Sequence, residues 1–319
     1  MNKGTLAQRY LDRSVIKHIK TNNKQTIAKS AIGNDFANID GIISTCGFSD
    51  NLYLAWTKAL NNFACSGGIC LGVHLNLYLP TDVKESNIKS IMEEFNLLAN
   101  RDKIQILGGH TEVSPIFSTF AYNVNVIGKS ANFLPDRKKI KPGFDIIMTK
   151  GTAIYGSDYL LNTKREELEN RFASSYLDGA NNGVALYSVV NDSKVCLDNN
   201  LDNIFYMHDV SYGGIFGALW QLAKWINKGV EINLNDVIIK QETIEMCEYF
   251  NLNPYMLDGT GALLLVANNG LDVVEKLNSN GILASVIGKV LDNNEKVVIT
   301  RGGDRRNLEP FDDDEINKI

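Results

Sequence analysis

The chain has 319 residues, of which 44% are hydrophobic and 22% are charged, and its formal net charge is -5. This length allows two domains of ordinary size, and the composition is that of a soluble globular protein. The net negative charge argues against a general nucleic-acid binder, because no basic excess is available to neutralise phosphates.

The five cysteines are scattered and form no C-x-x-C pair, which predicts reduced thiols rather than a zinc site. The basic N-terminal segment lacks the apolar run of a secretory signal, and no stretch of 18 apolar residues occurs that could span a membrane. We therefore expect a cytoplasmic protein with no membrane partner and no nucleic-acid partner.

Strand and helix periodicities alternate through the first part of the chain, after a predicted surface helix over residues 1–23. Residues 71–79 alternate strictly between apolar and other side chains, which is typical of a half-buried strand. Apolar residues at 3.6-residue spacing over 88–98 predict a helix. The expected elements are strands at 39–44, 71–79, 104–107 and 120–126, and helices at 52–60 and 88–98.

The segment from Gly108 to Pro115 is unusual because chemically active side chains follow two glycines. Glycines at a strand end allow a sharp turn or the close approach of a ligand. An imidazole (His110), a hydroxyl (Thr111) and a carboxylate (Glu112) come next. A tight turn with solvated side chains would account for the same residues, so local chemistry alone leaves both interpretations open.

A basic link at residues 138–142 separates the two expected domains, which we place at 1–140 and 141–319. The acidic end, Asp312 to Glu315, is interpreted as a solvated tail. The elements expected in the second domain are strands at 144–149, 204–207, 283–287 and 297–300, and helices at 157–168, 211–226, 242–250 and 271–279.

A second motif runs from Tyr206 to Gly214, between a short strand and a helix. We predict Ser211 as the helix N-cap, and free N–H groups at a helix N-terminus attract phosphate. Asp209 stands at the strand exit, where a carboxylate can bridge a metal ion to a ligand. The alternative is that Asp209 only caps the helix.

These motifs resemble those of one superfamily. Gly-Gly-His-Thr-Glu-Val-Ser-Pro, starting at Gly108, and Met-His-Asp-Val-Ser-Tyr-Gly-Gly, starting at Met207, are similar to motifs of aminoimidazole ribonucleotide synthetase, thiamine-monophosphate kinase, selenophosphate synthetase and the hydrogenase-maturation protein HypE. Residues 33–37, 61–68 and 149–151 resemble further motifs in the same order. The local motifs are closest to those of HypE.

The resemblance covers residues 30–300 and implies a two-domain α/β (α+β) fold. In this superfamily a curved N-terminal sheet binds ATP and pairs with a second subunit's sheet in a dimer barrel, and an α/β domain follows. A homodimer is therefore expected. The nucleotide would lie between the domains, with Mg²⁺ bridging its phosphates to aspartates.

Site residues are carried over from the matching motifs. The resemblance implies Asp35 and Asp209 as metal ligands, with Asp209 also acting in catalysis. His110 is our candidate general base. The implied nucleotide-binding residues are Asp35, Asn62, Gly108, Gly109, Thr111, Glu112, Lys150, Ser211, Gly213 and Gly214.

Three departures from the superfamily pattern bear on activity. Cys46 and Asn62 stand where relatives carry metal-binding aspartates, and Mg²⁺ prefers such carboxylates. HypE works through a cysteine at its extreme C-terminus, whereas this sequence ends in Asn-Lys-Ile and its last cysteine is Cys247. The chemistry of HypE is therefore not expected here.

The resemblance leads to one favoured function and two alternatives. We expect ATP-dependent phosphotransfer to a small-molecule acceptor, most specifically by an α-ribazole kinase acting in cobamide assembly. A non-catalytic nucleotide-binding protein is the first alternative, and the missing carboxylates favour it. An ATP-dependent synthetase or cyclo-ligase with another substrate is the second.

Overall fold

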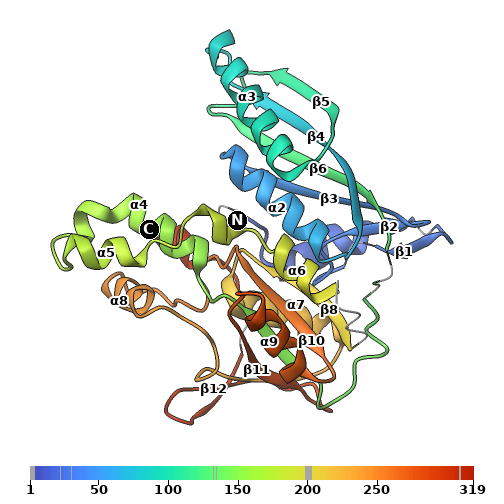
Figure 1. Ribbon diagram of the computed structural model, residues 1–319, viewed down its shortest axis with the longest axis vertical. Helices are drawn as coiled ribbons and strands as arrows, with labels where there is room; N and C mark the ends of the chain where they lie inside the picture. Colours follow the sequence, from blue (N-terminus) through green and yellow to red (C-terminus); the bar gives the residue numbers. More distant parts are fainter. Residues whose placement is uncertain are drawn as a thin grey trace. The chain divides into compact units, whose positions relative to one another are not determined.

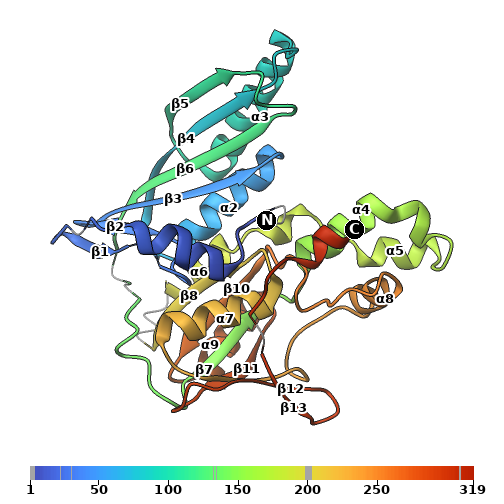
Figure 2. The same ribbon diagram turned by 180° about the vertical axis from the view of Figure 1, so that it is seen from behind.

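A computed structural model describes residues 4–21, 23–29, 31–131, 133, 135–197, 203–308 and 310–319 (Figures 1 and 2). Its contacts divide the chain into two compact units. The N-terminal unit comprises Asn23–Lys29 and Asp35–Leu134. The C-terminal unit comprises Met1–Asn22, Ser30–Asn34 and Pro135–Ile319. The boundary between the two units thus falls before Pro135, whereas the sequence suggests a boundary after residue 140.

The start of the chain is less helical than its sequence suggests. The α-helix α1 covers only Gln8–Tyr10, followed by the π-helical turn η1 (Leu11–Val15) and the 3-10 turn η2 (Ile16–His18). Only Ala7 and Gln8 are buried here, and a short helix with so little packing is marginal. Residues 1–3 and 22 of the predicted helix lie outside the described part of the chain.

The N-terminal unit is a six-stranded sheet with helices on one face (Figures 1 and 2). Its strands are β1 (Thr26–Ala28), β2 (Ala37–Ile39), β3 (Ile42–Ser49), β4 (Ile69–Leu79), β5 (Ile106–Val113) and β6 (Ala121–Lys129), in the order β1-β2-β3-β6-β4-β5. Its helices are α2 (Leu52–Ala64) and α3 (Glu85–Asp102). All neighbouring strands are antiparallel except β4 and β5, which α3 connects as a parallel pair.

Alternating side chains decide which face of this sheet is covered. Alternate residues of β3 are buried, and β4 buries Val73, Leu75, Leu77 and Leu79 under the helices. Trp56 of α2 packs edge-on against Phe95 of α3, with ring centroids 5.5 Å apart. The Trp56 indole also donates a hydrogen bond to Asp102 Oδ2 (2.7 Å), which holds the end of α3.

The Gly108–Glu112 segment does not form a tight turn, which is one of the two interpretations that its local chemistry leaves open. The segment lies inside β5, which runs on to Val113. Gly109 is needed for a different reason: a Cβ atom there would lie 1.8 Å from the carbonyl oxygen of Leu75 on β4, and its φ of +157° is unusual for other residues. The glycine therefore permits close strand pairing.

The C-terminal unit is built on a seven-stranded sheet with the order β13-β12-β9-β11-β7-β10-β8. The strands are β7 (Asp145–Thr149), β8 (Ile204–Val210), β9 (Val230–Asn233), β10 (Ala262–Ala267), β11 (Ala284–Val290), β12 (Lys296–Ile299) and β13 (Arg305–Asn307). Among neighbouring strands, β9 and β12 are parallel and the other pairs are antiparallel. Every residue of β10 is buried, as expected for a central strand.

Helices and short turns complete this unit. They are α4 (Ile154–Leu168), α5 (Ser174–Ala180), η3 (Val184–Tyr187), α6 (Val190–Leu197), α7 (Gly214–Ile226), α8 (Gln241–Tyr249), α9 (Gly270–Ser279) and η4 (Glu315–Lys318). A separate apolar cluster joins α4, α5 and α8 through residues such as Leu160, Leu177 and Met246. In the described residues we find no helix with the length and apolar character needed to cross a membrane.

Candidate functional site

The junction between β8 and α7 holds the strongest candidate site residues of the C-terminal unit. Asp209 is the penultimate residue of β8, as the sequence predicts for a strand exit, and it is only 3% exposed. His208 beside it is also buried. A ligand atom of His208 and one of Asp209 lie within 4.8 Å of each other, and the Asp209 carboxylate is the one of the two that offers the oxygen ligands Mg²⁺ prefers.

The beginning of α7 differs from the prediction. Ser211 is not the N-cap: Gly213 occupies that position in the left-handed region with φ +86°, and α7 begins at Gly214. The carbonyl of Ser211 instead accepts hydrogen bonds from the N–H groups of Gly214 (3.0 Å) and Gly259 (3.1 Å). Two consecutive glycines allow a tight turn here that a side-chain cap would not produce.

The amide of Gly213 already has a carboxyl partner. It donates a hydrogen bond to Oδ2 of Asp314, at 2.5 Å. The other oxygen of Asp314 accepts from the N–H groups of Asp258 (3.2 Å) and Ile316 (2.8 Å). A phosphate bound at the Gly213 amide, as the resemblance implies, would have to displace this carboxylate.

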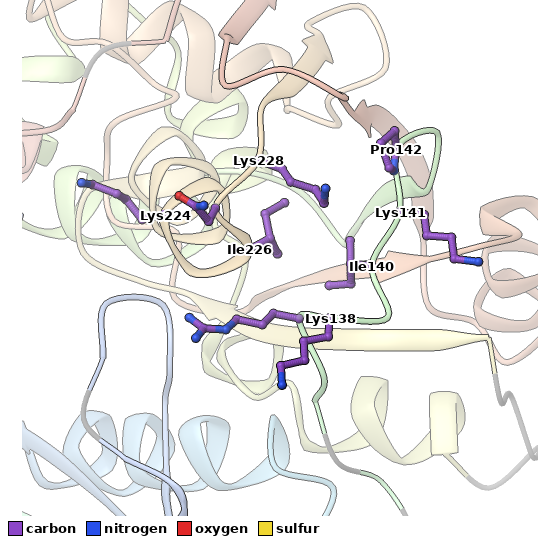
Figure 3. Close-up of a pocket in the computed structure, with 9 residues that line it drawn as sticks. Lys138, Ile140, Lys141, Pro142, Lys224, Ile226 and Lys228 are labelled. Carbon is purple, nitrogen blue, oxygen red and sulfur yellow. The ribbon is translucent and has the colours of Figure 1, made fainter.

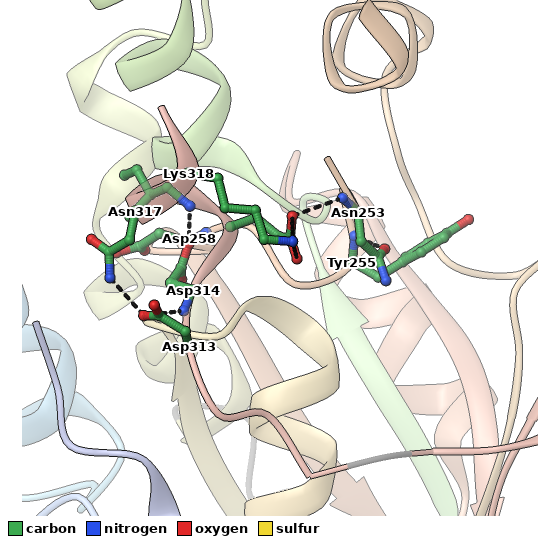
Figure 4. A network of polar contacts seen from close by, with 9 residues as sticks. Asn253, Tyr255, Asp258, Asp313, Asp314, Asn317 and Lys318 are labelled. Atoms are coloured by element: carbon green, nitrogen blue, oxygen red, sulfur yellow. Dashed lines mark hydrogen bonds and ion pairs between the residues drawn. The ribbon is translucent and has the colours of Figure 1, made fainter. Parts of the chain in front are cut away.

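The acidic C-terminal segment is therefore packed against the unit, and its interpretation as a solvated tail is wrong. Asp314 is fully buried and Glu315 is 5% exposed. Asp313 accepts a hydrogen bond from the Asn317 amide (2.6 Å; Figure 4). It also accepts one from the Tyr212 hydroxyl (2.7 Å). Charge alone suggested exposure, but backbone N–H groups and a hydroxyl satisfy these carboxylates inside the protein.

Burial makes the docking of this segment dependent on pH. Desolvation, followed by the charge of Asp258, raises the pKa of Asp314 to about 7. Because the pKa of Asp314 is higher in the folded protein than in the unfolded chain, folding favours the protonated carboxyl group. The stability that Asp314 contributes is therefore fully present below the unfolded pKa and is lost as pH rises through about 7. We expect the unfolding free energy of the C-terminal unit to fall by roughly 2–4 kcal/mol between pH 4 and pH 8 from this group.

Scanning calorimetry across this pH range checks the expectation. Asp314→Asn should flatten the pH dependence, because its amide does not titrate. Asp312→Asn is the matched control, since Asp312 forms an exposed ion pair with Arg9 (3.3 Å). An equal pH dependence in the wild type and in Asp314→Asn would contradict the role of Asp314.

Lys150 follows β7 in a left-handed conformation (φ +59°) and is largely buried. Its ammonium group bonds the carbonyl of Ser188 (2.7 Å) and pairs with Asp192 (3.1 Å). Asp192 also accepts a hydrogen bond from Thr149 (2.6 Å). Burial lowers the pKa of Lys150, and Asp192 partly offsets this. The predicted nucleotide contact would therefore compete with an existing ion pair.

In the N-terminal unit, the side chains of the β5 motif are exposed on an edge strand. His110 Nε2 lies 2.9 Å from Glu112 Oε2, and their side chains are 63% and 51% exposed. Thr111 is also exposed, and because successive side chains of a strand point to opposite faces, it lies on the other face of β5. The carboxylate can therefore orient the imidazole while leaving its other nitrogen accessible.

The two positions that lack the superfamily's aspartates are neighbours in the structure. The side-chain amide of Asn62, on α2, donates a hydrogen bond to the carbonyl of Cys46, on β3 (3.0 Å). The neighbouring Thr45 is anchored to α2 through the carbonyl of Ala59 (2.8 Å). An amide and a thiol thus occupy a place where the resemblance implies two negative charges.

Three further residues are candidates that sequence reasoning did not select. His208 precedes Asp209, and this adjacency was the available signal. Asp192 is far from Lys150 in sequence, so nothing in the motif pointed to it. The hydroxyl of Thr152 is buried and has no hydrogen-bond partner in the part of the chain that the structure describes, so it could serve a ligand.

These observations define a two-unit α/β protein with a buried aspartate and histidine at the end of a strand, next to a glycine-rich helix start. Residues 141–301 match the family model described as the C-terminal domain of AIR synthase related proteins, and the chain belongs to that family. This confirms the resemblance found in the sequence.

Two curated relatives show the range of the family. A Methanocaldococcus jannaschii protein, whose name links it to hydrogenase expression and formation, is 22% identical over 256 residues, covering 77% of this chain and 72% of the relative. The phosphoribosylformylglycinamidine synthase subunit PurL of Saccharolobus islandicus is 26% identical over 188 residues. That second match covers 54% of this chain and only 25% of PurL.

Solved structures confirm the fold. A crystal structure of a HypE–HypF complex matches with a TM-score of 0.76 at 17% identity, covering 95% of this chain and 98% of its counterpart. HypE in complex with ATP matches with a TM-score of 0.71 at 17% identity and coverages of 98% and 97%. Thiamine monophosphate kinase from Aquifex aeolicus gives 0.62 at 15% identity, with coverages of 86% and 92%.

Proposed function

We propose that the protein transfers the γ-phosphoryl group of Mg-ATP to a hydroxyl of a small nucleoside-like acceptor, with α-ribazole as the first candidate. The observation that carries the proposal is the buried Asp209 beside His208 at the end of β8. Its support is the family assignment together with similar structures of a HypE crystallised with ATP and of a kinase.

The residues present fit one magnesium ion. Asp209 supplies a buried carboxylate, and phosphate oxygens and water can complete the oxygen ligands that Mg²⁺ prefers. We propose Asp35 as the second carboxylate. The carbonyl of Gly33 accepts a hydrogen bond from the Tyr206 hydroxyl (2.7 Å), which ties Gly33 to strand β8. Asp35 follows Gly33 by two residues, so the Cα atoms of Asp35 and Gly33 are at most about 7.6 Å apart.

In this proposal the chain contributes charge neutralisation, positioning and proton removal. The bound ion would offset phosphate charge in the loose transition state of phosphoryl transfer. His110 takes the proton of the acceptor hydroxyl as the new O–P bond forms, and Glu112 holds the imidazole in orientation through the 2.9 Å contact. Thr111 offers a hydroxyl for a phosphate on the opposite face of β5.

The direct test is incubation of the purified protein with Mg-ATP and α-ribazole. We expect α-ribazole phosphate and ADP in equal amounts. A panel of other nucleosides and small alcohols, assayed in parallel, identifies the acceptor class. If ATP binds and none of these compounds is phosphorylated, the kinase proposal fails.

A non-catalytic nucleotide-binding role is the second candidate, because Asn62 and Cys46 occupy the place of two aspartates and bond each other. Calorimetry that shows ATP binding without turnover would favour this candidate. A synthetase or cyclo-ligase is the third candidate. It would release ADP and phosphate without a phosphorylated acceptor as the final product.

We also propose that the protein forms a homodimer through the N-terminal unit. The strands of this unit carry exposed apolar side chains at Ile42 (55%), Phe48 (63%), Ile69 (61%), Leu71 (45%) and Leu107 (49%). Large exposed apolar patches mark interaction surfaces, and a self-complementary sheet face suits a twofold interface.

We expect sedimentation to show a dimer at micromolar concentration and Phe48→Glu to produce monomers, because a charge would be buried in the apolar interface. Leu97→Glu is the matched control, since Leu97 is 68% exposed on α3 and not on a strand. A wild-type protein that sediments as a monomer would count against the proposal.

A further inference from the structure

A basic pocket of about 680 Å³ lies in the C-terminal unit, away from the motif residues (Figure 3). One wall is the link before β7, from Arg137 to Pro142, and the other is the end of α7 with the residues that follow it, up to Lys228. The turn at Lys141 is fixed by a hydrogen bond from the Phe144 N–H to the Lys141 carbonyl (3.2 Å). A backbone contact therefore holds the wall formed by the link.

The charges around this pocket all have one sign. Its lining includes five cations and no carboxylate: Arg137, Lys138, Lys141, Lys224 and Lys228. Across the described residues, none of the five is in an ion pair with an acidic side chain. A helix C-terminus attracts a cation in its last turn, which accounts for Lys224. It does not account for the cations of the link.

The floor of the pocket is apolar. Ile140 (2% exposed) and Ile226 (4% exposed) extend into the space between the two walls, and the side chain of Lys228 passes near them (Figure 3). Pro142 adds further apolar surface. A pocket of this size with an apolar floor and a few polar groups is typical of small-molecule sites.

A sixth cation, Lys296, lies close enough to Lys224 to feel its charge. Lys296 lies over the Trp220 ring, 5.1 Å from its centroid, and its pKa is lowered by burial and then by the positive charge of Lys224. A bound anion would relieve this repulsion. The chain has a net charge of -5, yet five cations without an ion-pair partner among the described residues gather around this pocket, and such a local excess of positive charge favours binding of an external anion.

We propose that this pocket binds a small organic phosphate, whose phosphate group contacts Lys228 and the basic link while its apolar part lies on Ile140 and Ile226. The site is separate from the proposed ATP site and does not depend on the kinase proposal. Inorganic anions would use only the cations, so the apolar floor favours a phosphate ester with a ring or short carbon skeleton.

Pyridoxal 5′-phosphate is a suitable probe, because its aldehyde condenses with a lysine amine to an imine and water, and borohydride reduces the imine to a stable secondary amine. Peptide mass mapping then locates the label. We expect Lys138, Lys141, Lys224 and Lys228 to be labelled faster by pyridoxal phosphate than by 5′-deoxypyridoxal, which keeps a free aldehyde but has no phosphate, by roughly tenfold. Lys139, an exposed neighbour outside the lining, should show little preference.

Two charge-reversal variants complete the test. Lys228→Glu and Lys141→Glu should each remove most of the phosphate preference at the remaining pocket lysines, and Lys139→Glu should leave it unchanged. Thermal unfolding of each variant verifies the fold, and Lys141 lies outside any helix. Labelling spread evenly over exposed lysines, or an equal rate with 5′-deoxypyridoxal, would overturn the proposal.

Discussion

Asp209→Asn is expected to weaken Mg-ATP binding by about 1.5–3 kcal/mol, or roughly 10- to 150-fold in Kd. The buried carboxylate is the strongest candidate metal ligand in the described C-terminal unit, and the amide keeps its shape while removing its charge. Asp35→Asn should act in the same direction. Isothermal titration with Mg-ATP measures both effects.

A buried aspartate elsewhere provides the matched control. Asp158 is 2% exposed and accepts hydrogen bonds from Tyr187 (2.8 Å) and from the Asn182 backbone (2.7 Å), so Asp158→Asn also replaces a buried charge. It should change thermal stability and leave ATP affinity near the wild-type value. Unchanged affinity in both Asp209→Asn and Asp35→Asn would remove the proposed metal site.

His110→Ala is expected to slow phosphoryl transfer by roughly 10²–10⁴-fold, the usual contribution of a positioned general base. Because His110 is exposed on an edge strand, its removal should leave the fold and the thermal midpoint nearly unchanged. Single-turnover rates with saturating ATP and acceptor measure the chemical step without the contribution of binding.

Glu112→Gln tests how much the orientation of the His110 imidazole contributes, separately from its role as a base. It keeps the imidazole and removes its 2.9 Å carboxylate partner, so we expect a smaller loss than in His110→Ala. His18→Ala, in the 3-10 turn η2, is the control for an exposed histidine. A His110→Ala enzyme with wild-type rates would show that another group accepts the proton.

Periodicity predicted the fold where the elements are long and one face is buried. The strict alternation over 71–79 became β4, and the 3.6-residue pattern over 88–98 became the middle of α3. Short elements such as α5, β9 and β13 were missed, since a few residues carry too little pattern. The N-terminal segment formed less helix than predicted because few of its side chains are buried.

The site could be predicted only as far as local motifs reach. Asp209 lies where its strand-exit position suggested. The partner of Lys150 is 42 residues away, and the partner of the Gly213 amide is 101 residues away, so neither could be found from spacing. The role of Gly109 also depends on the backbone of Leu75 across the sheet, which no local pattern reveals.

The C-terminal unit is assembled from segments on both sides of the N-terminal unit in sequence, and this has a consequence during synthesis. Arg9 pairs with Asp312, so a contact of the C-terminal unit joins a segment translated before the N-terminal unit to one translated after it. At about 5–20 residues per second, the segment around Arg9 waits roughly 15–60 s for its partner to emerge. The N-terminal unit, whose segments are synthesised within the first 134 residues, can fold in that interval. A ribosome stalled before Asp312 would therefore hold a folded N-terminal unit beside an unfinished C-terminal one.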